Sequence, residues 1–130
     1  MKIQLIFAPP KIKPKLAEIP EGVTPPLGIL YLASYLRKYL KNLELRLTDG
    51  LLAGWQGTLD KIEDFNPDVV FISYLTPCAI SAYYLVNHLK KKNHRTIIAL
   101  GGPHATALPQ EAFRLSRTDF VVIGEGEQTA

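Results

Sequence analysis

The sequence predicts a single α/β domain, residues 1–130, with a parallel β-sheet at its centre. Its 130 residues, 47% of them hydrophobic, are enough for one compact domain with its own core. Continuous apolar runs of strand length alternate with longer segments of helical periodicity, and this alternation is typical of βαβ units. Most of the short runs are apolar throughout, as expected where helices cover both faces of a parallel sheet.

Five strands are expected, and the second differs from the others. Residues 44–48, Glu-Leu-Arg-Leu-Thr, alternate polar and apolar side chains, which indicates a less covered strand at an edge of the sheet. An edge second strand and right-handed crossovers favour the order 2-1-3-4-5, a flavodoxin-like (Rossmann-like) three-layer sandwich. The predicted strands cover about residues 3–8, 45–48, 68–73, 96–100 and 119–123.

Helices are expected between these strands. The first should open at Thr24-Pro25-Pro26, since a proline in the first turn forfeits no hydrogen bond, and run from Leu27 to about Leu40. The chain ends where the last helix of such a fold should begin. We therefore expect a fragment with a truncated last helix and a sheet surface left open to a dimer partner. The other helices are expected at about residues 58–65, at about 78–91 and from near Pro109.

Composition and missing motifs exclude several classes of function. The net charge of +3 is small and dispersed, so nucleic acid is not indicated. The single cysteine, Cys78, excludes an internal disulfide and any multi-thiolate metal or iron–sulfur site of this chain, favours the cytoplasm, and is best read as a packed small residue. The apolar run at the N-terminus is too short for a signal peptide or a membrane span. No dinucleotide or P-loop motif, no nucleophile with its base and no metal-spaced cluster is present, so no catalytic or metal-binding residue is expected.

A ligand site is expected at the carboxyl ends of strands one and three, where the strand order reverses. The connection after strand one runs from Pro9 to about Thr24, whereas such loops usually have about 2 to 6 residues. After strand three, Ser73-Tyr74-Leu75-Thr76 offers hydroxyls that can bind a ligand without charge, although Thr76 can equally cap the next helix. Asp49-Gly50, after strand two, is read as an ordinary turn.

Two glycine-containing turns should reach the same edge of the sheet. Gly101-Gly102-Pro103-His104 follows strand four, and paired glycines permit positive φ and close approach to a ligand, with a plain tight turn as the alternative. For His104, completion of the turn is favoured over ligation of cobalt or iron. Gly124-Glu125-Gly126 follows strand five, where the carboxylates of Glu125 and Glu127 would repel a nucleotide phosphate.

Four segments carry a family resemblance through their order and spacing. They are residues 25–33 (Pro-Pro-Leu-Gly-Ile-Leu-Tyr-Leu-Ala), Pro67-Asp68, residues 101–106 (Gly-Gly-Pro-His-Ala-Thr) and residues 124–127 (Gly-Glu-Gly-Glu). Together they resemble the cobalamin (vitamin B12)-binding domain that precedes many radical S-adenosylmethionine domains. The resemblance covers essentially the whole chain and implies cobalamin as the ligand.

The wider cobalamin-binding fold carries three marks, and two are present. Ser73-Tyr74-Leu75 matches Ser-x-Leu and Gly101-Gly102 matches Gly-Gly, which by resemblance brings Ser73 and the glycines to the nucleotide tail of the cofactor. Pro9-Pro10-Lys11 stands where Asp-x-His-x-x-Gly would fall, so the resemblance implies base-off cobalamin without a histidine ligand from the first loop. The expected cofactor-binding residues are Pro9, Pro10, Ser73, Tyr74, Leu75, Thr76, Gly101, Gly102, Pro103, His104, Gly124, Glu125 and Gly126.

The resemblance also implies a longer parent protein. Its radical S-adenosylmethionine domain, with a 4Fe-4S cluster and S-adenosylmethionine, would lie beyond residue 130 and be the partner of this module, which is not catalytic alone. The parent would be a methyltransferase or a related enzyme. The alternative is a degenerate flavodoxin-like interaction domain whose loops are only turns. A flavin mononucleotide site is less favoured because its hydroxyl-rich phosphate loop is missing.

The cobalamin hypothesis makes two structural demands. Ser73, Gly101 and Gly124 must converge on one rim of the sheet. Valine in place of Gly101 or Gly102 should abolish binding and leave the fold largely intact.

Overall fold

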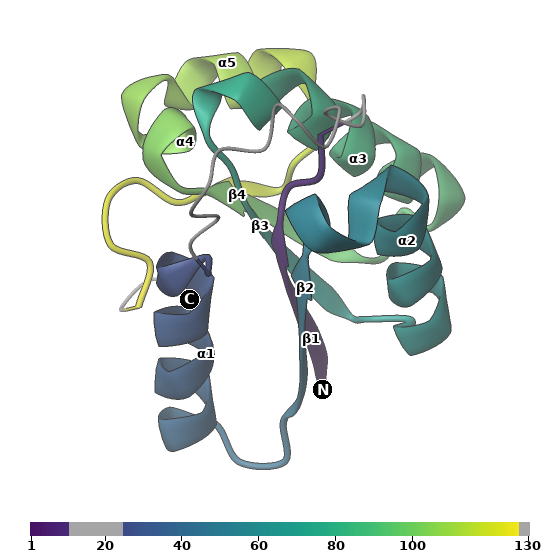
Figure 1. Ribbon diagram of the computed structural model, residues 1–130, viewed down its shortest axis with the longest axis vertical. Helices are drawn as coiled ribbons and strands as arrows, with labels where there is room; N and C mark the ends of the chain where they lie inside the picture. The colour runs from purple at the N-terminus through teal and green to yellow at the C-terminus, as the bar shows by residue number, and fades with distance from the viewer. Residues whose placement is uncertain (11–24, 128–130) are drawn as a thin grey trace.

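The sheet has the predicted topology. The computed structural model describes residues 1–10 and 25–127, and its five parallel strands lie in the order β2-β1-β3-β4-β5 (Figure 1). The expected order and the edge position of the second strand are therefore confirmed. The strands are β1 (Lys2–Phe7), β2 (Glu44–Asp49), β3 (Val69–Ser73), β4 (Ile97–Gly101) and β5 (Phe120–Val121).

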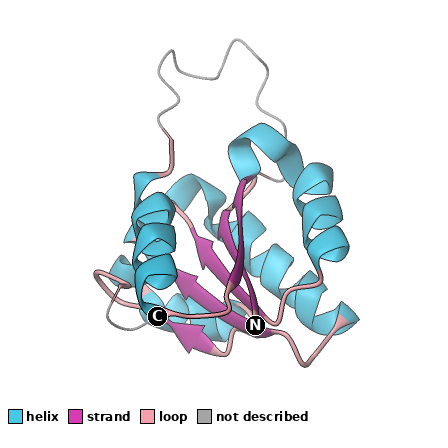
Figure 2. Ribbon diagram, turned by 90° about the horizontal axis from the view of Figure 1, so that it is seen from below, coloured by secondary structure: helices cyan, strands magenta, loops and turns pink. Residues whose placement is uncertain are grey.

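Helices cover both faces of the sheet, which gives the expected three layers (Figure 2). Among the described elements, α1 (Leu27–Tyr39) lies on one face by itself (Figure 1). The other face carries α2 (Gly50–Phe65), the 3₁₀ turn η2 (Thr76–Cys78), α3 (Ala79–Lys92), α4 (Pro103–Ala107) and α5 (Pro109–Leu115). None of the helices in the described ranges is both long enough and apolar enough to cross a bilayer.

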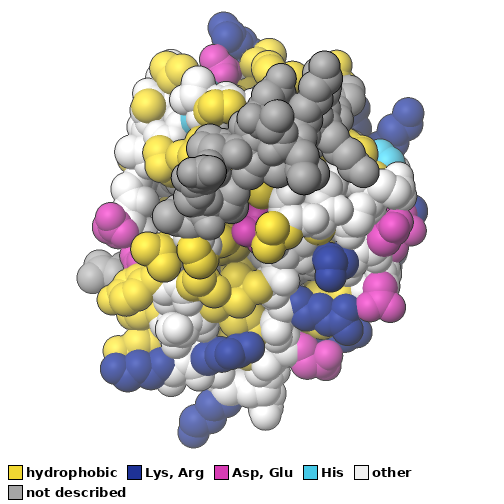
Figure 3. Space-filling view, viewed as in Figure 1, with side chains coloured by type: hydrophobic (Ala, Val, Ile, Leu, Met, Phe, Trp, Pro, Cys, Tyr) yellow, Lys and Arg dark blue, Asp and Glu magenta, His cyan; other side chains and the backbone are white. Residues whose placement is uncertain are grey.

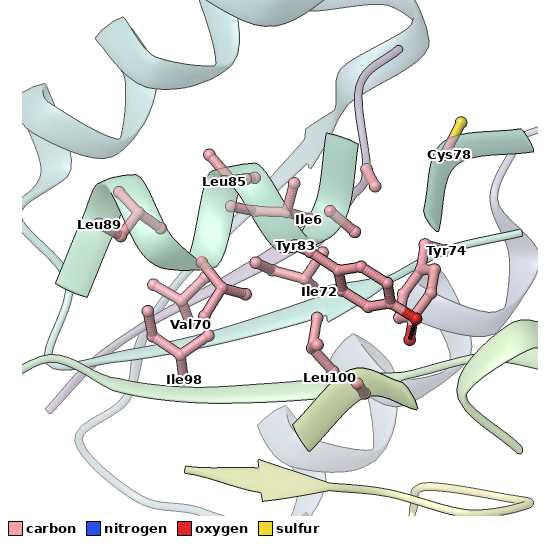
Figure 4. Packing of buried hydrophobic residues seen from close by; sticks show 14 of the residues in the cluster. Ile6, Val70, Ile72, Tyr74, Cys78, Tyr83, Leu85, Leu89, Ile98 and Leu100 are labelled. Carbon is pink, nitrogen blue, oxygen red and sulfur yellow. Dashed lines mark hydrogen bonds between the residues drawn. The ribbon is translucent and has the colours of Figure 1, made fainter. Parts of the chain in front are cut away.

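Strand alternation divides the apolar interior into two clusters. In β1, Leu5 faces α1 and Ile6 faces the opposite helices, since successive side chains of a strand point to opposite faces. The larger cluster packs β3 and β4 against α3, where Val70, Ile72, Ile98 and Leu100 meet Leu85 and Leu89 (Figure 4). The smaller cluster joins α1 to β1, and includes Ile29, Ala33 and Leu36.

The second helix begins at Gly50, not near residue 58 as predicted. The side chain of Asp49 accepts a hydrogen bond from the backbone N–H of Leu51 at 2.9 Å, so Asp49 is the N-cap of a helix and its reading as an ordinary turn was wrong. Gly54 has φ 72° and ψ 179°, which kinks the helix. Glycine disfavours regular helix, so the glycines at 50 and 54 caused the start of this helix to be predicted too late in the sequence.

Three other boundaries differ from expectation. Pro103 opens the short helix α4 in place of a tight turn, as a proline at the first helical position permits. Strand β5 ends at Val121, before the predicted 123. Helix α3 starts at Ala79 because a 3₁₀ turn occupies Thr76–Cys78. The predictions that concern Lys11, Thr24 and residues 128–130 lie outside the described residues.

Candidate functional site

A cavity of about 380 Å³ opens on the α1 face of the sheet, at the carboxyl ends of β3 and β4. This volume is within the range of about 300 to 1,000 Å³ usual for small-molecule sites. Ser73, Gly101 and Gly124 all line it, so the predicted convergence on one rim is confirmed. The remaining lining residues are Gly28, Ile29, Leu32, Phe71, Ile72, Ala99, Leu100, Gly102, Pro103, Thr106, Val122, Glu125, Gly126 and Glu127.

The cavity exists because small residues face it where none of the described helices fills the space. Helix α1 packs against β1 and β2, toward one side of the sheet. Farther along the sheet, the part of β4 that lines the cavity turns only the small residues Ala99 and Gly101 to this face, because Leu100 points into the opposite cluster. In the first turn of α1, Gly28 lines the cavity, and a Cβ at this position would meet no atom within 4 Å.

Gly102 is held in a backbone conformation that requires glycine. Its φ of 96° and ψ of −175° lie in a region essentially restricted to glycine. A Cβ at this position would stand 2.6 Å from Ser73 Oγ and 3.0 Å from the Tyr74 backbone nitrogen. The expectation that valine at 102 spares the fold is therefore wrong. At Gly101 the nearest atom to a Cβ is Val122 Cβ at 3.7 Å, an ordinary contact.

The turn after β5 forms another wall of the cavity. Gly124 has φ 74°, and its backbone N–H donates to Thr106 Oγ1 at 2.9 Å, which ties the turn to helix α4. Glu125 and Glu127 bring carboxylates to the lining, and Ser73 and Thr106 bring hydroxyls. Polar groups thus come from the end of β3, from α4 and from the turn after β5, whereas the rest of the central strands and α1 contribute apolar surface.

Neither His104 nor Tyr74 lines the cavity, and Tyr74 belongs to the apolar cluster on the opposite face of the sheet. His104 is 7% exposed within α4; its Nδ1 is 2.9 Å from Thr76 Oγ1 and its Nε2 is 3.1 Å from Glu111 Oε1. The Tyr74 hydroxyl donates to the Tyr83 hydroxyl (Figure 4), and the Tyr83 hydroxyl donates to Glu111 Oε1. The reading of His104 as the end of a turn is replaced by a buried histidine that joins two rim turns.

The charges in this network follow from its hydrogen bonds. Hydrogen bonds from His104 and Tyr83 lower the pKa of Glu111, so the carboxylate is the favoured form. Burial raises the pKa of both tyrosine hydroxyls, most strongly that of Tyr83. Since an ionised Glu111 only accepts, His104 carries its proton on Nε2, and the Thr76 hydroxyl can donate to Nδ1 when the ring is neutral.

The remaining predicted residues frame the rim without lining the cavity. Pro9 is buried, and its carbonyl accepts a hydrogen bond from Ser81 of α3. Pro10 is half-buried. Leu75 is exposed next to Thr76. The sequence predicted the rim but not most of the cavity wall. The feature that could have indicated the wall is the small size of Ala99 and Gly101 in β4.

Other titratable groups do not form a second centre among the described residues. No group of three or more His, Cys, Asp or Glu side chains there could hold a metal ion. Cys78 is buried, and burial raises the pKa of its thiol, which agrees with a packed small residue.

Comparison with known proteins identifies the family. Residues 16–130 match the model of the B12 binding domain. The chain belongs to the B12-binding domain family. It is 34% identical over 132 residues to an uncharacterized methyltransferase of Pyrococcus horikoshii, a match that covers 99% of this chain and 28% of that protein. It is 27% identical over 126 residues to the cytidylyl-2-hydroxyethylphosphonate methyltransferase of Streptomyces wedmorensis, covering 82% of this chain and 23% of that one.

This B12-binding domain spans about a quarter of the length of the curated relatives it matches. No solved structure matches it. The cavity fits the aromatic base of a cobalamin tail, because Phe71 and Val122 offer apolar contact and the missing side chain of Gly28 keeps the space open. The hydroxyls of Ser73 and Thr106 at the rim could form hydrogen bonds with the polar sugar portion of such a tail.

Proposed function

We propose that this domain holds cobalamin with its nucleotide tail in the α1-side cavity and its corrin over the carboxyl ends of the strands. One observation carries the proposal: a cavity of about 380 Å³ opens at the rim where Ser73 meets Gly102, in a chain of the B12-binding family. When bound, cobalamin supplies methyl-carrying or redox chemistry at its cobalt. The residues of this chain bind and orient it.

Each part of the rim has a separate task in this proposal. Gly102 keeps the turn after β4 close to β3, so that no side chain blocks the entrance. The Ser73 hydroxyl offers a neutral hydrogen-bonding group at the entrance. The His104–Glu111 pair holds the Thr76 turn against α4 and α5, and these contacts support the rim on the side away from the cavity.

The coordination state is part of the proposal. Pro9 and Pro10 follow β1 where the wider fold carries its histidine, so if the tail base lies in the cavity, no imidazole of that motif would replace it at cobalt. We further propose that the parent is a methyltransferase in which a radical S-adenosylmethionine domain, with its 4Fe-4S cluster, acts on the cofactor held here. The names of the two relatives support a methyltransferase, and the four sequence segments support the radical S-adenosylmethionine domain.

Titration with hydroxocobalamin tests the binding function directly. We expect a visible-spectrum change that saturates at one cofactor per chain, and pigment that stays with the protein through gel filtration. The position of the cobalt absorption bands reports whether the tail base is coordinated. No spectral change and no retained pigment at high micromolar cofactor would refute cobalamin binding by this chain.

A further inference from the structure

The walls of the cavity differ sharply in polarity between its floor and its rim. The floor side chains are those of Ile29 and Leu32 from α1, Phe71 from β3, Ala99 from β4, and Val122. All are hydrocarbon. The hydroxyls and carboxylates that line the cavity come from Ser73, Thr106, Glu125 and Glu127, which lie at strand ends, in α4 or in the turn after β5.

The backbone at the floor offers little compensation. Residues 71–73 and 99–101 are paired in the ladder between β3 and β4. On the other side of β4, the Val122 N–H donates to Leu100 O at 2.8 Å. The Gly101 carbonyl accepts from the Tyr74 N–H at 3.2 Å. Backbone donors and acceptors of this part of the sheet are therefore largely committed to one another.

We infer that this cavity selects cobamides whose tail ends in a benzimidazole over cobamides whose tail ends in a purine such as adenine. The inference rests on the proposed function, because it assumes that the tail enters the cavity. A dimethylbenzimidazole in this cavity would present hydrocarbon edges and two methyl groups to a surface that includes Phe71 and Val122. Adenine would bring an exocyclic amine and extra ring nitrogens to the same surface, and buried polar groups without partners weaken binding.

The size of the preference follows from one unpaired polar group. Leaving such a group buried weakens binding by about tenfold or more, and the adenine edge has several. We therefore expect the chain to bind cobalamin at least about tenfold more tightly than the adenine-tailed cobamide. Cobinamide, which lacks the nucleotide tail altogether, should bind more weakly than cobalamin.

Free cobamides differ in how readily their own base leaves cobalt, so the decisive comparison uses a variant. Val122→Thr keeps the side-chain shape and adds a hydroxyl to the cavity wall. The ratio of the two cobamide affinities should fall by about tenfold in this variant, and the change in ratio cancels the properties of the free ligands. Ile123→Thr is the matched control, because Ile123 is 60% exposed and does not line the cavity.

Equilibrium dialysis with cobalamin, the adenine-tailed cobamide and cobinamide gives all of these affinities. A preference for cobalamin that shrinks in Val122→Thr and persists in Ile123→Thr supports the inference. Equal affinity for the two cobamides, or a ratio that Val122→Thr leaves unchanged, overturns it while leaving cobalamin binding intact. Cobinamide binding as tightly as cobalamin overturns both this inference and the tail position, and no binding of any of the three refutes the proposed function itself.

Discussion

Gly28 offers a test in which stability and binding change in opposite directions. It lies in the first turn of α1 and lines the cavity, and a Cβ there would meet no protein atom within 4 Å. In Gly28→Leu, the helix loses its most flexible residue, which should stabilise the fold by about 0.5 to 1 kcal/mol. Under the proposed function, the new side chain would compete with the cofactor tail for the space beside residue 28. Overpacking of this kind costs about 1 to 3 kcal/mol, which corresponds to a loss of cobalamin affinity of about 5-fold to 150-fold.

The control for Gly28→Leu is Gly57→Ala in α2, where the added Cβ meets only Ala53 Cβ at 3.5 Å, an ordinary contact. This variant should gain stability without any change in affinity. Urea unfolding at equilibrium measures the first quantity and hydroxocobalamin titration the second. If Gly28→Leu binds cobalamin as tightly as the unmodified chain while folded, the tail does not use this cavity and the reasoning fails.

Three further predictions concern the frame of the site. Gly102→Ala should lower the free energy of unfolding by about 1 to 3 kcal/mol, because φ is 96° there and the new Cβ would clash with Ser73 Oγ; chemical denaturation of this variant beside Gly101→Ala, which should be nearly neutral, measures the difference. Asp49→Ala should cost about 1 kcal/mol by removing the N-cap of α2, whereas Asp49→Asn should retain most of it; equal thermal midpoints for both variants would contradict the capping role. The pKa of Glu111 is lowered in the folded chain, so its carboxylate contributes to folding stability at pH values above its ordinary pKa of 4.5. This contribution is lost as the pH falls below that value and through the lowered pKa. The difference in free energy of unfolding between the unmodified chain and Glu111→Gln should therefore become smaller below about pH 4.5. If this difference stays constant as the pH is lowered, the ionised carboxylate is not the source of the stabilisation.

The order of the sheet was predictable because it depends on patterns that extend over whole elements. The alternation in Glu44–Asp49 indicated an edge strand, and the apolar runs at β3 and β4 indicated a covered centre. The rim was predictable for the same reason, since parallel strands deliver all their carboxyl ends to one edge. Local chemistry was harder to read: the N-cap role of Asp49 depends on one hydrogen bond to Leu51, and the flanking glycines favoured a turn.

The floor of the cavity could not be predicted because it is an unfilled space between elements that are far apart in the sequence. Gly28, Ala99 and Val122 are ordinary residues of a helix, a strand and a loop, and only the packing of α1 over β1 and β2 leaves space above them. His104 shows the opposite case. It was expected among the cofactor-binding residues because it follows the Gly101-Gly102-Pro103 turn, but its ring lies against Thr76 and Glu111.

The molecule also leaves apolar surface exposed over α1, where hydrophobic side chains gather in the lower left of Figure 3. Leu27 is 71% exposed and Tyr31 is 64% exposed. Both belong to the helix that supplies Gly28 and Ile29 to the cavity wall. Helix α1 therefore carries both exposed apolar surface and part of the cavity wall, so a substitution in this helix should be checked for its effect on both.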